Sequence, residues 1–198
     1  MYEGECVTVK KPPTLSRIAV LVVDMQYDFV AEDAPVKCRN AEKIIEPIGK
    51  LLNTARKKGV PIIYFKEVHR PKWIDLGIEK EKEPLHCLEG TKGAEIVKEL
   101  IPKDGDYVIT KRRYSGFYGT DLDILLRCLK IDTLVVTGVA TNLCVRATCE
   151  EAKFRDYHIV VPQECVAGTS IESHECTLSD IQNFYGDVLP VDEVCNKL

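Results

Sequence analysis

The sequence predicts a single α/β domain in three layers, with a mainly parallel sheet of about six strands and helices on both faces. Two observations predict this fold class. Short, unbroken apolar runs recur along the chain, as in strands that are covered on both faces, and segments with helical apolar spacing lie between them. The length of 198 residues suits one domain. We therefore treat residues 1–198 as one domain in which residues 1–16 form an N-terminal extension.

The elements follow from local pattern. Residues 18–23 read IAVLVV, an unbroken apolar run that predicts the first strand. Apolar residues at 44, 45, 48, 51, 52 and 55 predict a helix over 41–58, and Gly59 ends it. The elements expected after it are a strand at 60–65, a short helix at 94–100, a strand at 107–110, a helix at 121–129, a strand at 133–138, a helix at 143–154, a strand at 158–161, a helix at 173–185 and the segment DVLPV at 187–191. This alternation is typical of right-handed crossover units in a parallel sheet.

Composition and charge exclude several classes of protein. Hydrophobic residues make up 45% of the chain and charged residues 29%, which is typical of a globular protein. The formal net charge of −4 provides neither a basic surface for nucleic acid nor a polybasic patch for a membrane. No apolar run approaches the ~20 residues that a membrane span needs. The N-terminus also lacks the apolar core of a secretory signal, so we expect a cytoplasmic protein.

The nine cysteines do not form a recognisable framework. Their number is odd, and no C-x-x-C pair occurs, so neither a zinc ribbon nor a dithiol redox site is indicated. We expect reduced thiols, most of them serving as small core hydrophobes.

Polar residues follow the ends of four predicted strands. Ligands bind at the carboxyl ends of strands in such sheets, so these residues are expected on one rim. They are Asp24, Gln26, Asp28, Glu67, His69, Lys111, Thr141, Asn142 and Cys144. Gln26 and Asp28 are expected to hold the loop that carries Asp24. The charge run EKEKEP at 79–84 is expected to be a solvated loop.

Cys144 has two interpretations. If Thr141 or Asn142 caps the helix, the thiol lies in the first turn, where free N–H groups and the helix dipole favour a thiolate. The alternative is a buried cysteine on a helix face, as we assume for Cys149.

Asp24 and Lys111 also have two interpretations each. Asp24 ends an apolar strand, where a carboxylate is costly unless it is paired or solvated, but it could simply cap a turn. Lys111 opens the run KRRY, and such runs usually form a solvated face. Together with Cys144, these residues would supply a nucleophile, a base and a charge partner.

Four motifs carry a resemblance to a known family. They are VLVVDMQYDF, HCLEGTKGAEI, VITKRRYSGFYGTDLD and TLVVTGVATNLCVRATCEEA, which cover most of residues 18–167 in order. The chain resembles the isochorismatase-like cysteine hydrolases, which include nicotinamidases and N-carbamoylsarcosine amidases. The resemblance implies a triad of Asp24, Lys111 and Cys144. It also implies a cis peptide between Val139 and Ala140, and an oxyanion hole made by the N–H groups of Ala140 and Cys144.

The resemblance implies hydrolysis of a small carboxamide or ureido compound through a thioester on Cys144. One alternative is isochorismatase-type vinyl-ether hydrolysis, which the cysteine disfavours because that chemistry needs an acid rather than a thiol. Another is a non-catalytic relative that binds metabolites or other subunits. The expected partners are the small-molecule substrate and further copies of the chain, in a homo-oligomer (dimer or tetramer).

The resemblance also implies a candidate metal site. Nicotinamidases carry a metal held by D-x-H and later histidines, and the matching residues here are Glu67, His69 and His86. A carboxylate and two imidazoles suit zinc, iron or manganese. The departures are that glutamate replaces aspartate and that no third histidine follows, although Asp75 stands near that place. The alternative is two ordinary loop histidines, since relatives with a similar VHRP segment need no cofactor for the chemistry.

Three aromatic residues are candidates for substrate binding. Phe29, Trp73 and Phe117 are further residues expected at the rim, and they could line an aromatic pocket. The alternative is that they belong to the core or to a subunit interface.

Overall fold

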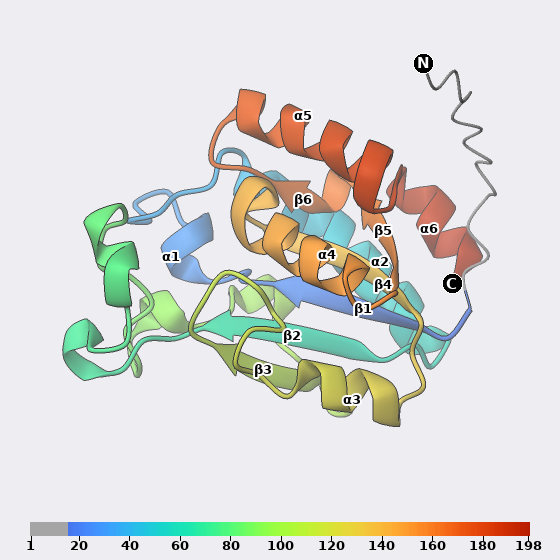
Figure 1. Cartoon of the computed structure of the whole chain (residues 1–198), viewed down its shortest axis with the longest axis horizontal. Helices are drawn as coiled ribbons and strands as arrows, with labels where there is room; N and C mark the ends of the chain where they lie inside the picture. The colour runs from blue at the N-terminus through green and yellow to red at the C-terminus, as the bar shows by residue number, and fades with distance from the viewer. Residues whose placement is uncertain (1–15) are drawn as a thin grey trace, which may run out of the picture.

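A computed structural model describes residues 16–198. The predicted extension, residues 1–16, lies outside the described residues except for Ser16. The chain forms a sheet of seven strands, all paired in parallel, in the order β3-β2-β1-β4-β5-β7, with β6 paired to β4 (Figure 1). The strands are β1 (Ile18–Val23), β2 (Ile62–Glu67), β3 (Tyr107–Lys111), β4 (Thr133–Val139), β5 (His158–Pro162), β6 (Val166–Ala167) and β7 (Asp187–Leu189). The predicted α/β class is confirmed.

Helices cover both faces of the sheet. They are α1 (Tyr27–Val30), α2 (Ile45–Lys57), α3 (Leu122–Cys128), α4 (Arg146–Lys153), α5 (Ile171–Asp180) and α6 (Val191–Lys197). Short 3₁₀ turns are η1 (Ala41–Ile44), η2 (Pro71–Trp73), η3 (Gly77–Glu81), η4 (Lys92–Ala94), η5 (Lys98–Leu100) and η7 (Gln163–Cys165). Two π-turns, η6 (Thr141–Val145) and η8 (Ile181–Tyr185), adjoin α4 and α5.

The central strand β1 divides the core into two clusters. Val20 and Val22 face the cluster that α2 and α6 cover, whereas Leu21 and Val23 face the cluster that α3 and α4 cover. Alternate side chains of a strand point to opposite faces, and all of these valines and leucines are fully buried. This two-sided burial explains why the strand reads as an unbroken apolar run.

The local structure differs from the expectation in several places. Residues 94–100 do not form one helix, because Ile96 makes an antiparallel bridge with Gln26 and separates η4 from η5. The helix that follows β4 begins as the π-turn η6, and no side chain caps it: the Thr141 hydroxyl lies 2.9 Å from Nδ1 of His174, and Asn142 bonds Thr169. Helix α6 was not expected, nor was the short strand β6.

The cysteine prediction is largely confirmed for the part of the chain that the structure describes. Five of the eight described cysteines are buried, Cys195 is half-buried, and all eight are free thiols. Cys128 and Cys176 are exposed, so they are not core residues. As for membranes, no helix within residues 16–198 is long and apolar enough to cross a bilayer.

Candidate active site

The strand register brings four chain segments to one edge of the sheet. Glu67, the last residue of β2, is paired with Lys111, the last residue of β3. Val23 of β1 is paired with Phe65 on one side and with Gly138 of β4 on the other. The carboxyl ends of β1 to β4 therefore lie side by side, as parallel strands require.

A buried ammonium group lies at the centre of this edge. The Nζ atom of Lys111 is 2.7 Å from Oδ2 of Asp24, 2.6 Å from Oε2 of Glu67 and 3.6 Å from Sγ of Cys144. The thiol is also 3.8 Å from Oε2 of Glu67. All four side chains are buried, with Cys144 the most accessible at 5% exposed. The structure thus brings together the three residues of the predicted triad and adds Glu67 to them.

Burial and charge set the protonation of this cluster. Burial raises the pKa of Asp24 to about 6, although the ammonium of Lys111 opposes the shift. Burial disfavours the charged form of Lys111, but the charges of Asp24, Cys144 and Glu67 hold its pKa well above the ordinary value. At neutral pH the cluster therefore contains a charged amine beside an ionised Asp24.

The surroundings of Cys144 favour the protonated form of its thiol. Burial raises its pKa well above the ordinary value; Lys111 opposes the shift, whereas the charges of Asp24 and Glu67 and a hydrogen bond to Asp24 add to it. Burial, together with the two neighbouring carboxylates, therefore opposes the thiolate that a helix start would favour. Deprotonation of Cys144 requires a base, and a carboxylate oxygen of Asp24 lies within 4.8 Å of its sulfur.

The turn that carries the thiol approaches β1 closely. Gly138 has φ +104°, and a Cβ atom there would lie 2.0 Å from the carbonyl oxygen of Val23. Only glycine fits this conformation and this distance. The peptide bond between the two residues that follow, Val139 and Ala140, is cis, as the resemblance implied.

The turn also positions backbone donors. The carbonyl of Ala140 accepts the N–H groups of Leu143 and Val145, which closes the turn around Cys144. The N–H groups of Ala140 and Cys144, which the resemblance assigns to an oxyanion hole, both belong to this turn beside the thiol.

Gln26 fixes the loop after β1. Its Nε2 donates to the carbonyls of Glu67 at 2.7 Å and Ala94 at 2.9 Å, and its Oε1 accepts the N–H group of Glu67 at 2.7 Å. The Asp28 carboxylate accepts the N–H group of Cys87 at 2.6 Å. These bonds tie the loop of Asp24 to β2 and to residues 87–94, as expected for both side chains.

Glu67, His69 and His86 also converge. Oε1 of Glu67 lies 3.3 Å from Nε2 of His69 and 3.4 Å from Nε2 of His86. The other ring nitrogens face acceptors: Nδ1 of His69 is 3.4 Å from Oδ1 of Asp75, and Nδ1 of His86 is 2.7 Å from the carbonyl of Pro84. Each imidazole therefore faces an acceptor at both nitrogens.

This arrangement fits a bound cation as well as protonated imidazoles. A neutral ring whose Nδ1–H meets an acceptor directs a lone pair from Nε2 at the Glu67 carboxylate. That contact is favourable only if the ring is protonated or if a cation lies between the two groups. Burial lowers the pKa of His86, but hydrogen bonds to Glu67 and to the Pro84 carbonyl, together with the charges of Glu67 and Glu83, outweigh burial and leave the pKa raised. The three residues could hold a metal through one ligand atom each.

The candidate pocket aromatics do not gather in one place. The Phe29 ring meets the His86 ring edge-on, with the ring centroids 5.5 Å apart. Trp73 donates its indole N–H to the carbonyl of His86 at 2.8 Å. Phe117 instead packs against Tyr157, with the guanidinium of Arg155 over its ring. Only Phe29 and Trp73 lie against the histidine cluster.

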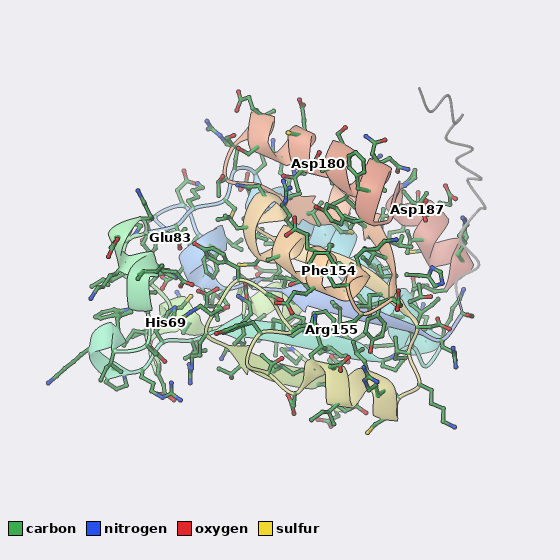
Figure 2. All side chains as sticks on the ribbon, viewed as in Figure 1. His69, Glu83, Phe154, Arg155, Asp180 and Asp187 are labelled. Atoms are coloured by element: carbon green, nitrogen blue, oxygen red, sulfur yellow. The ribbon has the colours of Figure 1, made fainter. Side chains whose placement is uncertain are left out.

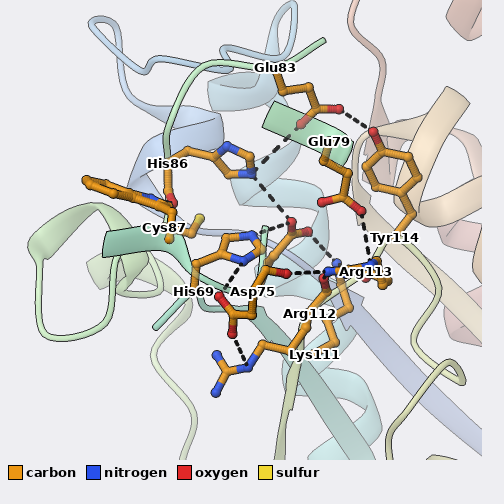
Figure 3. A network of polar contacts seen from close by, with 12 residues as sticks. His69, Asp75, Glu79, Glu83, His86, Cys87, Lys111, Arg112, Arg113 and Tyr114 are labelled. Atoms are coloured by element: carbon orange, nitrogen blue, oxygen red, sulfur yellow. Dashed lines mark hydrogen bonds and ion pairs between the residues drawn. The ribbon is translucent and has the colours of Figure 1, made fainter. Parts of the chain in front are cut away.

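The charge run at 79–84 is not a purely solvated loop, contrary to expectation. The Glu79 and Glu83 side chains are only 11% and 14% exposed, and they turn inward to Arg113 and Tyr114 (Figure 3). Figure 2 shows Glu83 at the same end of the molecule as His69. No sequence signal separated these two glutamates from their solvated neighbours.

Comparisons with known proteins agree with this geometry. The Isochorismatase domain matches residues 18–193. The chain belongs to the isochorismatase family. An N-carbamoylsarcosine amidase of Arthrobacter sp. is 33% identical over 189 residues, which cover 92% of this chain and 72% of that relative.

Solved structures in the isochorismatase family superpose closely. An isochorismatase-like hydrolase from Alkaliphilus metalliredigens has a TM-score of 0.85 and 36% identity, covering 91% of this chain and 98% of that one. A pyrazinamidase/nicotinamidase from Streptococcus mutans UA159 has a TM-score of 0.82 and 32% identity, covering 87% and 99%. The resemblance to isochorismatase-like hydrolases inferred from the motifs is confirmed.

Proposed function

We propose that this isochorismatase-family amidohydrolase, an enzyme acting on C–N bonds, cleaves a small carboxamide or ureido compound through a thioester on Cys144. The observation that supports the proposal is one buried ammonium, Nζ of Lys111, in contact with both a carboxylate and a thiol. A nucleophile, a base and a charge partner within one hydrogen-bonded cluster are the parts that acyl transfer needs. Vinyl-ether hydrolysis has no use for the thiol.

The proposed reaction begins with transfer of the Cys144 thiol proton to Asp24. The sulfur attacks the substrate carbonyl carbon, and the N–H groups of Ala140 and Cys144 stabilise the resulting oxyanion. Asp24 then gives its proton to the leaving nitrogen, so the C–N bond breaks and a thioester remains. Water, losing a proton to Asp24, attacks the thioester carbon. The carboxylic or carbamic acid leaves, and the proton returns to the thiol. Lys111 keeps its charge throughout and balances the two carboxylates.

Ammonia release from a panel of carboxamides and ureides tests the proposal. Nicotinamide and N-carbamoylsarcosine come first, because they are the substrates named for two relatives. We expect turnover of at least one compound of the panel, and none by heat-denatured protein. A panel without turnover, together with mild iodoacetamide labelling that does not favour Cys144 over the other thiols, would instead support a non-catalytic metabolite-binding protein.

The pH dependence of catalysis follows from Asp24. Its pKa of about 6 means that the base form is lost as the pH falls through that value. We expect kcat/KM to decrease by about tenfold per unit below about pH 6, because a protonated Asp24 cannot accept the thiol proton. The measurement is a pH profile of ammonia release. A profile of the parent enzyme that stays flat to about pH 4 would assign the base to another group.

A second candidate, a nicotinamidase with a metal beside the pocket, is favoured by the convergence of Glu67, His69 and His86. All three ligand atoms lie within 4.8 Å of one another. A divalent cation bound there would orient a ring nitrogen of the substrate. The thiol, Asp24 and Lys111 would perform the same proton transfers in either case.

Metal content tests this candidate without reference to turnover. If the site binds zinc, the purified protein dialysed against zinc is expected to retain about one ion per chain, and His86→Ala to retain far less. Elemental analysis gives the ratio. Alkylation of Cys144 is expected to survive chelation, because the thiol depends on Asp24 and Lys111. If the parent and His86→Ala retain equal, substoichiometric zinc, His69 and His86 are ordinary loop histidines that do not bind a metal.

We further propose a cytoplasmic homo-oligomer, a dimer or tetramer, as the working form. Light scattering on the purified protein measures the number of subunits, and cell fractionation locates the protein.

A further inference from the structure

A cavity of about 280 Å³ lies behind the turn that carries the thiol. Three segments line it: residues 39–47, which run through η1 into α2, residues 163–168, which include η7 and β6, and residues 170–174 at the start of α5. Neither Lys111 nor Cys144 lines this cavity. The proposed reaction therefore gives it no role.

The floor of the cavity is apolar. Ile44, Val166 and Ala167 line it and are no more than 5% exposed. Ile171, at the start of α5, also lines the cavity, although this residue is 52% exposed. An apolar group that packed against these side chains would be removed from water, which is favourable. The volume is near the lower end of the range for sites that bind small molecules.

Two cationic side chains line the cavity without ion-pair partners. No carboxylate within residues 16–198 lies at ion-pair distance from Arg39 or Lys43, and Glu172 acts on Arg39 only at longer range. The carboxylate of Glu164 also lines the cavity, but its Oε2 accepts the N–H group of Val191 at 2.8 Å. In a chain with a net charge of −4, this is a local excess of positive charge, and it attracts anions.

His174 adds a neutral hydrogen-bonding group. Its ring lines the cavity, and its Nδ1 lies 2.9 Å from the hydroxyl oxygen of Thr141. Burial lowers the pKa of His174, which favours the neutral imidazole near pH 7. If the Thr141 hydroxyl donates to Nδ1, the ring proton is on Nε2, where it is available to an acceptor on a ligand.

The walls of the cavity are held together by bonds within the protein. The N–H group of Arg39 donates to the carbonyl of Gly168 at 2.8 Å, which joins the segment leading into η1 to the segment between β6 and α5 (Figure 1). The side chain of Asn142 accepts the N–H group of Thr169 at 3.0 Å and donates to its hydroxyl at 2.9 Å. A site with walls already fixed loses less entropy when a ligand binds.

We propose that this cavity binds a small amphipathic anion, whose carboxylate or phosphate group is held by Arg39 and Lys43 and whose apolar body packs on Ile44 and Val166. Hydrogen bonds from charged donors to such anions are the strong ones, and guanidinium matches their geometry. The apolar floor favours an anion with an apolar body over a bare inorganic ion. This binding is separate from the proposed hydrolysis.

Isothermal titration calorimetry of the full chain at constant ionic strength tests the proposal. The probes are benzoate, phenyl phosphate, inorganic phosphate and neutral benzyl alcohol. We expect one molecule of benzoate or phenyl phosphate to bind per chain, at least about tenfold tighter than inorganic phosphate and benzyl alcohol. The tighter of the two aromatic anions identifies the preferred charged group. If neither binds, or if either control binds equally well, the proposal is wrong.

Variants assign the binding to residues. Arg39→Gln and Lys43→Gln are each expected to weaken binding of the preferred anion by about tenfold or more. Both side chains are exposed, so both variants are expected to fold. Lys57→Gln removes the same charge from an exposed lysine of α2 that does not line the cavity, and it is expected to change nothing. Unchanged affinity in either cavity variant would overturn the assignment.

Alkylated protein separates this cavity from the proposed catalytic cluster. Alkylation of Cys144 by iodoacetamide blocks the proposed substrate site, and we expect the affinity for the anion to stay within about threefold. Loss of binding after alkylation would place the anion at the thiol and contradict the proposal. Calorimetry needs no turnover, so a protein that binds the anion but hydrolyses nothing supports this inference and contradicts only the hydrolase mechanism.

Discussion

Replacement of Cys144 by alanine is expected to abolish hydrolysis and leave the fold intact. The thiol is small and lies at the sheet edge, so its removal deletes few packing contacts, and the free energy of unfolding should change by less than about 1.5 kcal/mol. The proposed mechanism has no other nucleophile. We expect kcat to fall by about 10⁴-fold or more, measured as ammonia release from the best compound of the panel.

Cys149→Ala is the matched control. Cys149 is also buried, five residues further along the same helical segment and in the same apolar cluster, but among the described residues it makes no hydrogen bond with Lys111. This variant is expected to lose stability through the cavity that it leaves and to retain its activity at temperatures where it is folded. Residual hydrolysis within tenfold of the parent in Cys144→Ala would exclude the thioester mechanism. If both variants lost activity to the same extent, the loss would be due to unfolding rather than to removal of the nucleophile.

The sequence was sufficient to predict the sheet because the sheet depends on strong local signals, whereas the triad was assigned through the resemblance of the motifs to a known family. The buried strands are unbroken apolar runs, and Asp24 and Lys111 are polar residues placed where such runs end. Parallel pairing then brings strand ends together without further information. The residues 94–100 were mispredicted as a helix because their conformation is set by a bridge to Gln26, a partner some 70 positions away in the chain.

The ion pair between Glu67 and Lys111 could not be predicted from the position of Glu67 near His69 in the sequence. Sequence spacing places it with the histidines, and it does contact them through Oε1. Only the β2–β3 register shows that its other oxygen pairs with Lys111. The burial of the Glu79 and Glu83 side chains could not be predicted either, because nothing in the run EKEKEP distinguishes them from the exposed residues between them. Their partners, Arg113 and Tyr114, come from a different loop.

Replacement of Lys111 by methionine is expected to be the most damaging single change to stability in the site. Methionine has nearly the same length and can fill the same space, so the loss is mainly electrostatic. Asp24 and Glu67 would be left buried and close together without a cation. Removing one partner of a buried ion pair typically costs about 3–5 kcal/mol of unfolding free energy. We expect a loss of that size near neutral pH in denaturant unfolding, together with a fall in kcat of about 10²-fold or more.

The pH dependence of that loss identifies its cause. In the parent, burial disfavours ionisation of Glu67, but the charge of Lys111 and bonds from His69 and His86 lower its pKa well below the ordinary value. This residue therefore stabilises the parent above its unfolded pKa, and that stabilisation is lost as the pH falls through the lower folded value. In Lys111→Met the carboxyl pKa values should instead rise, so the variant should become more stable as the pH falls from about 7 toward about 4.5.

A double variant completes the argument. Adding Asp24→Asn to Lys111→Met removes one of the two unpaired charges, so it is expected to restore part of the lost stability while leaving the enzyme inactive. The two changes should therefore be strongly non-additive in both unfolding free energy and kcat, because the residues act as one buried unit. Stability losses that simply add, with no recovery at low pH, would show that Lys111 serves packing and that Asp24 and Glu67 do not depend on its charge.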